Sequence, residues 1–388
     1  MGRQGECGVS FDSRATVTSL ESIFLQAARL GRQGTLSKVA RLRNLAINIL
    51  VSAGRRNLLR LKGRVTPVAI ALSPTMHCNF GCAGCYAADY PRDDELSDWA
   101  LNDLLTQAER LGVFLVIVTG GEPLLRDGLV AMLASHRRLL FLMVTNGTLV
   151  DDAQARAIAR SRNIVPVVSL EGPREFTDRR RGEGAFDGGI AAMARLDRER
   201  VLFGFSATVT AENWSAVIAD EFVSDMIGRG CALGFYTEYV PVASGVRPDW
   251  VMADHERKLF RQGVLAIRRG RPLIPVHLPD DEYDKHGRCL GVTGGSVHIN
   301  AQGYVEPCPF AHVAVDRIGD RTLAGALESR FLKELRSSKA VVRHGHIGCA
   351  LIENRALLQE IARRTGAMPT DSPRLTPTAG DASPPHSA

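Results

Sequence analysis

The most informative stretch of the sequence is His77-Cys78-Asn79-Phe80-Gly81-Cys82-Ala83-Gly84-Cys85-Tyr86, which follows an apolar, strand-like run at 68–72. Its cysteines are separated by three and then by two residues. Thiolates at this spacing on a glycine-containing loop can bind three corners of one iron-sulfur cluster and leave the fourth iron without a protein ligand. That iron is then free to bind another molecule.

Two other uses of these cysteines fit the spacing less well. A structural zinc site needs four ligands in two CxxC-like pairs, and the nearest nitrogen donor, His77, adjoins Cys78, where two ligands rarely serve one tetrahedral ion. Disulfides are disfavoured because three cysteines cannot pair among themselves and no secretory signal precedes them. An iron-sulfur cluster is the favoured interpretation.

The motif Cys78-x3-Cys82-x2-Cys85, followed by Tyr86, resembles the signature of the radical S-adenosylmethionine (radical SAM) enzymes. The resemblance implies that the three thiolates hold a [4Fe-4S] cluster whose fourth iron binds SAM. It implies reductive cleavage of SAM to methionine and a 5'-deoxyadenosyl radical, which abstracts a hydrogen atom from a substrate. A reductant such as flavodoxin or ferredoxin would supply the electron. The alternative from another class is a non-catalytic iron-sulfur or zinc-binding protein.

Short β-branched runs alternate with helix-period segments along the chain. The expected strands cover 68–72, 113–119, 139–145, 164–170, 201–209 and 233–242, and the expected helices cover 125–135, 151–160, 189–196 and 214–228. This alternation predicts an α/β fold with a parallel sheet that forms a partial (β/α)6 TIM-like barrel. In such barrels the chemistry takes place at the carboxyl ends of the strands.

Two strand ends near the cysteines resemble cofactor-binding segments of the family. Gly120, Gly121 and Glu122 follow the second strand, and the resemblance implies that they bind the ammonium group of SAM. Asn146 follows the third strand and, with Tyr86, is assigned to the cofactor site. A Gly-Gly turn alone would be weak evidence, but this one lies one βα unit after the cysteines.

The fourth strand end completes the expected cofactor site. By resemblance, Ser169 contacts the ribose hydroxyls and Arg181 binds the methionine carboxylate, whose planar charge suits a guanidinium group. Glu171 stands where relatives usually carry Asp, and the added methylene could alter the contacts to the substrate. For Arg179 and Arg180, a solvated helix entrance is an equally good interpretation.

The sixth expected strand contains a candidate catalytic carboxylate. A strand period of two places Tyr236 and Glu238 on one face, and Phe235, Thr237 and Tyr239 on the other. If the first set points into the barrel mouth, Glu238 becomes a group that binds the substrate or handles a proton. An ion pair with a neighbouring arginine is the more ordinary interpretation.

The chain beyond residue 272 carries a second set of cysteines. A change in composition at 273–275 and an acidic run at 280–282 predict a domain junction. Cys289 and Cys308 flank a predicted hairpin with glycine at its turn, and Cys349 precedes a helical run at 351–364. The pattern resembles a reduced SPASM or twitch extension, which implies a small α+β domain with one auxiliary iron-sulfur cluster.

Several ligand sets remain open for this second site. The fourth ligand could be His344, His346, a nonprotein ligand or the substrate. The same cysteines could instead form a zinc site with one histidine, or remain buried thiols. Cys7 and Cys231 lack partners at useful spacing and are expected to be plain thiols.

Four regions follow from these patterns. They are a basic helical N-terminal extension at 1–66, the radical SAM core barrel at 67–272, the auxiliary-cluster domain at 273–364 and a disordered tail at 365–388. A chain of 388 residues with 45% hydrophobic content can bury the cores of two domains. Eight cysteines without a signal peptide predict that the protein is located in the reducing cytoplasm.

The segment at 29–64 is basic and has apolar residues every three or four positions. Docking onto the barrel with the arginines in solvent is the favoured interpretation, and peripheral contact with a membrane near a lipid substrate is the second. Nucleic-acid binding is disfavoured because the segment lacks interleaved aromatic residues and RNA-binding motifs.

The sequence does not identify the substrate. The N-terminal extension looks helical and basic, unlike the winged-helix module that many peptide-modifying relatives use to hold a leader peptide. A small molecule, cofactor precursor or lipid-like substrate is therefore favoured, with peptide modification as the alternative.

Overall fold

The computed structural model of the chain describes residues 45–371, except 285 and 344–347. The strands are β1 (Ala69–Leu72), β2 (Leu115–Val118), β3 (Leu140–Thr145), β4 (Ile164–Ser169), β5 (Gly204–Val209), β6 (Leu233–Glu238), β7 (Ile274–Leu278), β8 (Ser296–Ile299), β9 (Val305–Glu306), β10 (Val313–Ala314) and β11 (Met368–Pro369). The helices are α3 (Leu45–Leu61), α4 (Asp98–Leu111), α5 (Leu129–Ser135), α6 (Asp152–Ser161), α7 (Arg174–Arg181), α8 (Ala185–Arg198), α9 (Trp214–Val217), α10 (Asp220–Gly228), α11 (Asp254–Gly270), α12 (Leu290–Thr293), α13 (Leu323–Ala326), α14 (Arg330–Ser337), α15 (Ala350–Glu353) and α16 (Arg355–Thr365). The 3₁₀ turns are η1 (Pro123–Leu125), η2 (Pro248–Trp250) and η3 (Asp280–Glu282).

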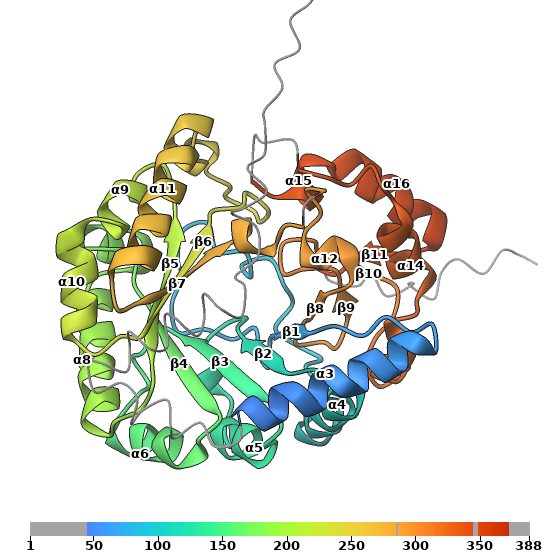
Figure 1. Cartoon of the computed structure of the whole chain (residues 1–388), viewed down its shortest axis with the longest axis horizontal. Helices are drawn as coiled ribbons and strands as arrows, with labels where there is room; N and C mark the ends of the chain where they lie inside the picture. Colours follow the sequence, from blue (N-terminus) through green and yellow to red (C-terminus); the bar gives the residue numbers. More distant parts are fainter. Residues whose placement is uncertain (1–44, 285, 344–347, 372–388) are drawn as a thin grey trace, which may run out of the picture.

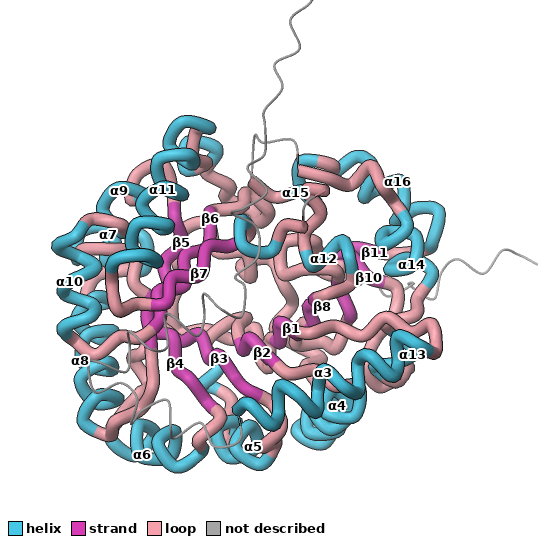
Figure 2. The backbone as a smooth tube through the Cα atoms, in the orientation of Figure 1, coloured by secondary structure: helices cyan, strands magenta, loops and turns pink. Residues whose placement is uncertain are grey.

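Strands β1 to β9 form one curled sheet in the order β7-β6-β5-β4-β3-β2-β1-β8-β9. In this order, every neighbouring pair between β7 at one edge and β8 is parallel. The last pair, β8 with β9, is antiparallel. Figures 1 and 2 show helices on the outer side of this curved sheet. The predicted partial TIM-like barrel is confirmed, and its six expected strands correspond to β1–β6.

The two faces of the sheet have different side chains because successive residues of a strand point to opposite sides. The outward set packs under the helices and includes the fully buried Val116, Phe141 and Phe205. The inward set is smaller and more polar, with Ala71 of β1 and Thr208 of β5 lining a cavity. This arrangement leaves room for ligands inside the curved sheet.

The sheet continues past the boundary predicted at residue 272. β7 pairs in parallel with β6, and β8 pairs in parallel with β1 up to Leu72 and Ile299. The predicted hairpin is present as β8 and β9, but its first strand belongs to the barrel sheet. The composition change at 273–275 thus marks the start of another strand of the same sheet, and the division into domains stays a prediction.

Helix α3 lies along α4 at the edge of the barrel (Figure 1). Arg55 and Arg56 donate hydrogen bonds to the backbone carbonyls of Glu109 and Gly112, at the end of α4. Apolar side chains of α3 are instead exposed, among them Ile47, Leu50, Leu58 and Leu61. Helix α3 therefore docks onto the barrel, as expected. The expectation that its arginines face solvent is wrong for Arg55 and Arg56, because they donate hydrogen bonds to carbonyls left without partners at the end of α4. Residues 1–44 lie outside the described part of the chain.

Among the described residues, no helix combines the length and the apolar character needed to cross a membrane.

The docking of α3 predicts different costs for two adjacent leucines. Leu59 packs against the main core, whereas Leu58 is 56% exposed. We expect Leu59→Ala to lower the free energy of unfolding by about 1–2 kcal/mol, and Leu58→Ala to change it by less than about 0.5 kcal/mol. Urea unfolding of the metal-free protein measures both values. Equal effects of the two substitutions would show that α3 does not dock as described.

Candidate functional site

The loop after β1 carries Cys78, Cys82 and Cys85 to the rim of the cavity enclosed by the sheet. Burial raises the pKa of the Cys78 and Cys82 thiols, and the charges of neighbouring cysteines raise it further. All three cysteines line the same cavity. Thiolates kept close in a partly buried site need a cation to balance them, and a metal cluster supplies one.

The glycine pair after β2 holds the cysteine loop in place. Gly121 N–H donates to the carbonyl of Thr75 at 2.9 Å, and Glu122 N–H donates to that of His77 at 2.8 Å. A Cβ on Gly121 would lie 2.0 Å from the His77 oxygen, and Gly120 has a φ of +99°. Both positions therefore require glycine for close approach of two backbones. The family role in binding SAM stays a prediction for them.

Glu122 links the ends of two strands beneath this loop. Its buried carboxylate accepts hydrogen bonds from Leu124 N–H at 3.1 Å, Thr145 Oγ1 at 2.8 Å and Asn146 N–H at 2.8 Å. Burial raises the pKa of Glu122 despite these bonds. Asn146 in turn donates through Nδ2 to Asn79 Oδ1 at 2.7 Å, inside the cysteine loop. Glu122 and Asn146 both line the cavity, as the sequence analysis expects for a shared site.

Tyr86 connects the first cysteine loop to the second set of cysteines. Its hydroxyl lies 3.1 Å from Thr119 Oγ1 and accepts a hydrogen bond from Gly120 N–H at 3.0 Å. Its ring packs edge-on against Phe310, with centroids 5.7 Å apart. Burial raises the pKa of Tyr86 to about 12, so the hydroxyl stays protonated at neutral pH. Because Phe310 is two residues from Cys308, the two loops share one packing contact.

A buried polar chain runs beside this contact. His298 of β8 lies 2.8 Å from Ser73 Oγ through Nε2 and 2.5 Å from Glu306 Oε2 through Nδ1. Tyr90 donates to the same Glu306 oxygen at 2.8 Å. These groups are fully buried and join the end of β1 to the hairpin that precedes Cys308. These hydrogen bonds fix the hairpin against the cysteine loop.

The end of β4 presents Ser169 to the cavity and places Glu171 against two arginines. Glu171 Oε1 lies 2.5 Å from Arg180 Nη1 and 2.6 Å from Arg181 Nη2. Burial alone would raise the pKa of Glu171, but the two guanidinium groups hold it below its usual value. Arg181 also approaches Cys82 Sγ at 4.0 Å. The solvated interpretation is wrong for Arg180, which is 11% exposed, whereas Arg179 is 57% exposed.

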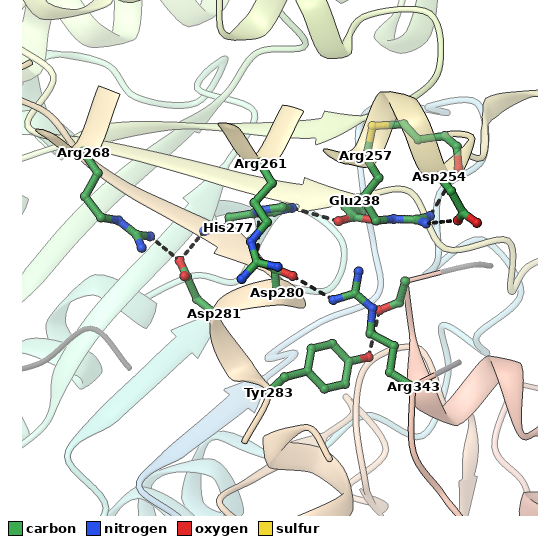
Figure 3. A network of polar contacts seen from close by, with 12 residues as sticks. Glu238, Asp254, Arg257, Arg261, Arg268, His277, Asp280, Asp281, Tyr283 and Arg343 are labelled. Atoms are coloured by element: carbon green, nitrogen blue, oxygen red, sulfur yellow. Dashed lines mark hydrogen bonds and ion pairs between the residues drawn. The ribbon is translucent and has the colours of Figure 1, made fainter. Parts of the chain in front are cut away.

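Glu238, at the end of β6, lies in an ion-pair network that Figure 3 shows. Its carboxylate binds Arg257 Nε at 2.7 Å and His277 Nε2 at 2.8 Å. Burial opposes ionisation, but His277 and Arg257 hold the pKa of Glu238 below its usual value. This is the ordinary pairing that the sequence analysis weighed, and the catalytic role of Glu238 stays a prediction.

The premise that Tyr236 points into the barrel mouth is wrong. Tyr236 is fully buried in the outer core, where its ring meets Phe205 and Phe260 edge-on. The alternate residues Phe235 and Thr237 line the cavity, and Glu238 reaches it only at the end of the strand. Periodicity separates the two sets but does not say which one faces inward.

Cys289, Cys308 and Cys349 line the same cavity as the first triad. Burial, followed by the charges of neighbouring groups, raises the pKa of Cys289 to about 12 and that of Cys308 well above its usual value. Burial also raises the pKa of Cys349 to about 11. Cys231 is buried away from both sets, 3.9 Å from the sulfur of Met193. His344, His346 and Cys7 lie outside the described residues.

The number and type of donors in each triad suit an iron-sulfur cluster. Within the described ranges, no three His, Cys, Asp or Glu side chains are grouped closely enough to hold one metal ion. A four-iron cluster binds each thiolate at a separate iron, so its ligands surround the cluster without meeting at one point.

One residue that lines the cavity was missed as a functional candidate. Glu282 lies there, although its acidic run was interpreted as a domain junction.

Comparison with known proteins decides the family. The sequence model of the Radical SAM superfamily matches residues 72–216, which contain the cysteine loop and the ends of β2 to β4. Residues 72–216 of this chain therefore form a radical SAM domain. The family's cofactors are a [4Fe-4S] cluster and SAM, and its members are enzymes.

Relatives of two kinds resemble this radical SAM protein. It is 28% identical over 243 residues to the Fe-coproporphyrin III synthase of Methanosarcina barkeri, covering 61% of this chain and 59% of that one. It is 28% identical over 323 residues to the mycofactocin maturase MftC of Mycolicibacterium smegmatis, covering 74% of this chain and 77% of that one. The structure of Streptococcus suis SuiB bound to precursor peptide SuiA superposes with a TM-score of 0.61 at 17% identity, covering 73% and 70% of the two chains. That likeness establishes the fold.

The contact beneath the cysteine loop predicts an asymmetry between two glycines. We expect Gly121→Ala to lower the free energy of unfolding by about 3 kcal/mol, because the new Cβ overlaps a backbone carbonyl that cannot move without the loop. Gly54→Ala, in α3, meets nothing within 4 Å and should raise stability by roughly 0.5–1 kcal/mol. Urea unfolding of the metal-free variants measures both. A Gly121→Ala variant as stable as the parent would contradict the described contact.

Proposed function

We propose that this chain is a radical SAM enzyme that abstracts a hydrogen atom from a substrate held between two iron-sulfur sites. The observation that carries the proposal is the single cavity onto which both cysteine triads and the expected SAM residues open. Cys78, Cys82 and Cys85 would hold the [4Fe-4S] cluster. Together, the cluster and SAM supply a 5'-deoxyadenosyl radical when an electron is delivered.

Residues of this chain would bind and orient the cofactor. Ser169 at the end of β4 would meet the ribose hydroxyls, and Arg181 would meet the methionine carboxylate. The ion pair with Glu171 supports the second role, because it holds the Arg181 guanidinium beside Cys82 in one orientation. Gly120, Gly121 and Glu122 would face the ammonium group, with Tyr86 and Asn146 supporting their backbone.

The second triad would hold an auxiliary cluster. Cys289, Cys308 and Cys349 each bring a sulfur to the same wall, and their high pKa values favour neutral thiols unless a metal compensates the charge. The apolar groups Phe235, Leu278 and Leu351 line the same cavity as the two triads and would exclude water from a reactive intermediate.

Two substrate classes have support. A small molecule or cofactor precursor agrees with the basic, helical character of the N-terminal segment and with the likeness to a protein named a Fe-coproporphyrin III synthase. A peptide is equally supported by the likeness to the maturase MftC, which covers more of this chain. Comparing metabolites and peptides of cells with and without the intact first triad distinguishes the two classes. Flavodoxin or ferredoxin is the proposed reductant.

The first prediction of this proposal concerns the product of SAM. Anaerobically reconstituted, reduced protein should convert SAM to 5'-deoxyadenosine, detected by liquid chromatography and mass spectrometry. The triple variant Cys78→Ala/Cys82→Ala/Cys85→Ala should make none, while Cys231→Ala, which changes a cysteine outside both triads, should match the parent. Cluster-replete parent protein that forms no 5'-deoxyadenosine would favour the non-catalytic iron-sulfur alternative.

The second prediction concerns the auxiliary cluster. The reconstituted parent should bind about eight irons per chain, as two [4Fe-4S] clusters require. Cys308→Ala should remove about half of this iron and leave SAM cleavage largely intact, because the first triad is unchanged. Iron analysis combined with the 5'-deoxyadenosine assay measures both. A parent protein that binds only about four irons per chain would contradict the auxiliary cluster and leave the proposal of the first cluster unaffected.

A further inference from the structure

The turn η3 carries three consecutive acidic residues, and two of them are neutralised. Asp280 binds Arg343 Nη1 at 2.7 Å and Arg261 Nε at 3.0 Å. Asp281 binds Arg268 Nη2 at 2.6 Å and accepts a hydrogen bond from His277 N–H at 2.8 Å. Figure 3 shows Asp280 beside Arg261 and Arg343, and Asp281 beside Arg268. These contacts fix the orientation of the turn.

Glu282, the third acidic residue, points elsewhere. Its half-buried side chain lines the cavity beside Cys289, Cys308 and Cys349. No hydrogen bond or ion pair to its carboxylate is found among residues 45–371, with the gaps already given. Burial, together with the charge of Asp281, raises the pKa of Glu282 to about 7.

Glu282 and the three cysteines of the second triad line one cavity. The charge of Glu282 adds to burial in raising the pKa of all three thiols. Glu282 therefore belongs to the same cluster of groups as the second triad.

The residue after Glu282 fixes this arrangement. The hydroxyl of Tyr283 donates to the carbonyl of Gly348 at 2.8 Å and accepts from Ala350 N–H at 2.8 Å. It thereby bonds to the backbone on both sides of Cys349. Because Tyr283 adjoins Glu282, these two hydrogen bonds tie the backbone that carries Glu282 to the backbone that carries Cys349.

A carboxylate placed among three thiols with no cation is costly unless a metal compensates it. Iron accepts carboxylate oxygen as well as thiolate sulfur, and a [4Fe-4S] cluster held by three cysteines has one iron left to bind. We propose that Glu282 is the fourth protein ligand of the auxiliary cluster. This inference rests on the auxiliary cluster of the proposed function.

The test uses the full chain in the background Cys78→Ala/Cys82→Ala/Cys85→Ala, in which the auxiliary cluster is observed alone. Glu282→Gln should shift the EPR spectrum of the reduced cluster and lower its iron content by at least half. Glu282→Cys should restore about four irons per chain and give a Mössbauer spectrum of four thiolate-bound sites. Glu353→Gln is the matched control, because it removes a charge near Cys349 without removing the proposed ligand. It should leave the spectrum unchanged.

Four results would overturn the inference. A Glu282→Gln spectrum identical to that of the background protein, or a shift caused by His344→Ala or His346→Ala instead, would exclude Glu282 as the ligand while leaving the cluster intact. Iron loss in Glu282→Gln that Glu282→Cys does not recover would assign the residue to folding. A background protein without iron would remove the auxiliary cluster itself, and with it this ligand, which is a failure of the proposed function.

Discussion

The parallel pairing of β8 with β1 is the contact on which the arrangement of the site depends. β1 leads directly into the first cysteine loop, and β8 leads through the hairpin to Cys308. Adjacent parallel strands bring their carboxyl ends to the same edge of a sheet, so the first cysteine loop and the hairpin turn after β8 lie at one edge. The antiparallel strand β9 then carries the chain back to Cys308, which lines the same cavity. The buried contacts of His298 with Ser73 and Glu306 hold the two strands in this register. Without that pairing, the two triads would have no common cavity.

Charged residues of opposite sign line the cavity, Arg180 and Arg181 on the one hand and Glu282 on the other. Arg180 and Arg181 approach Cys82, and their charges lower the pKa of that thiol against the effect of burial. Glu282, by contrast, raises the pKa values of the three cysteines of the second triad. The surroundings of the first triad therefore suit an anionic group such as a cofactor carboxylate, and those of the second suit a cation-rich cluster. This difference follows from which charged residues follow β4 and β7.

Local patterns in the sequence were sufficient for the barrel strands and the cysteine loop. The strands β1–β6 are short β-branched runs separated by helix-period segments, and each can be recognised from its own residues. The cysteine spacing is equally local. Helix α4, by contrast, was not among the expected helices, although Ser97 caps its first turn and Gly112 ends it in a left-handed conformation.

Long-range features were not predictable in the same way. Nothing near 274–278 says that β7 joins β6, because strand pairing depends on residues about forty positions away. The inward face of β6 could not be assigned from the sequence, because a period of two leaves both faces open. The contacts of Glu171 with Arg180 and Arg181, and the exposure of Glu282 to the second triad, arise only after the sheet curls.

The most direct test of the account is a crystal structure of anaerobically reconstituted protein with SAM, with anomalous diffraction recorded at the iron edge. The account predicts iron density at both Cys78/Cys82/Cys85 and Cys289/Cys308/Cys349, with SAM at the first site and a shared cavity between them. Iron at one triad alone, or density at the two triads separated by a closed wall, would contradict it.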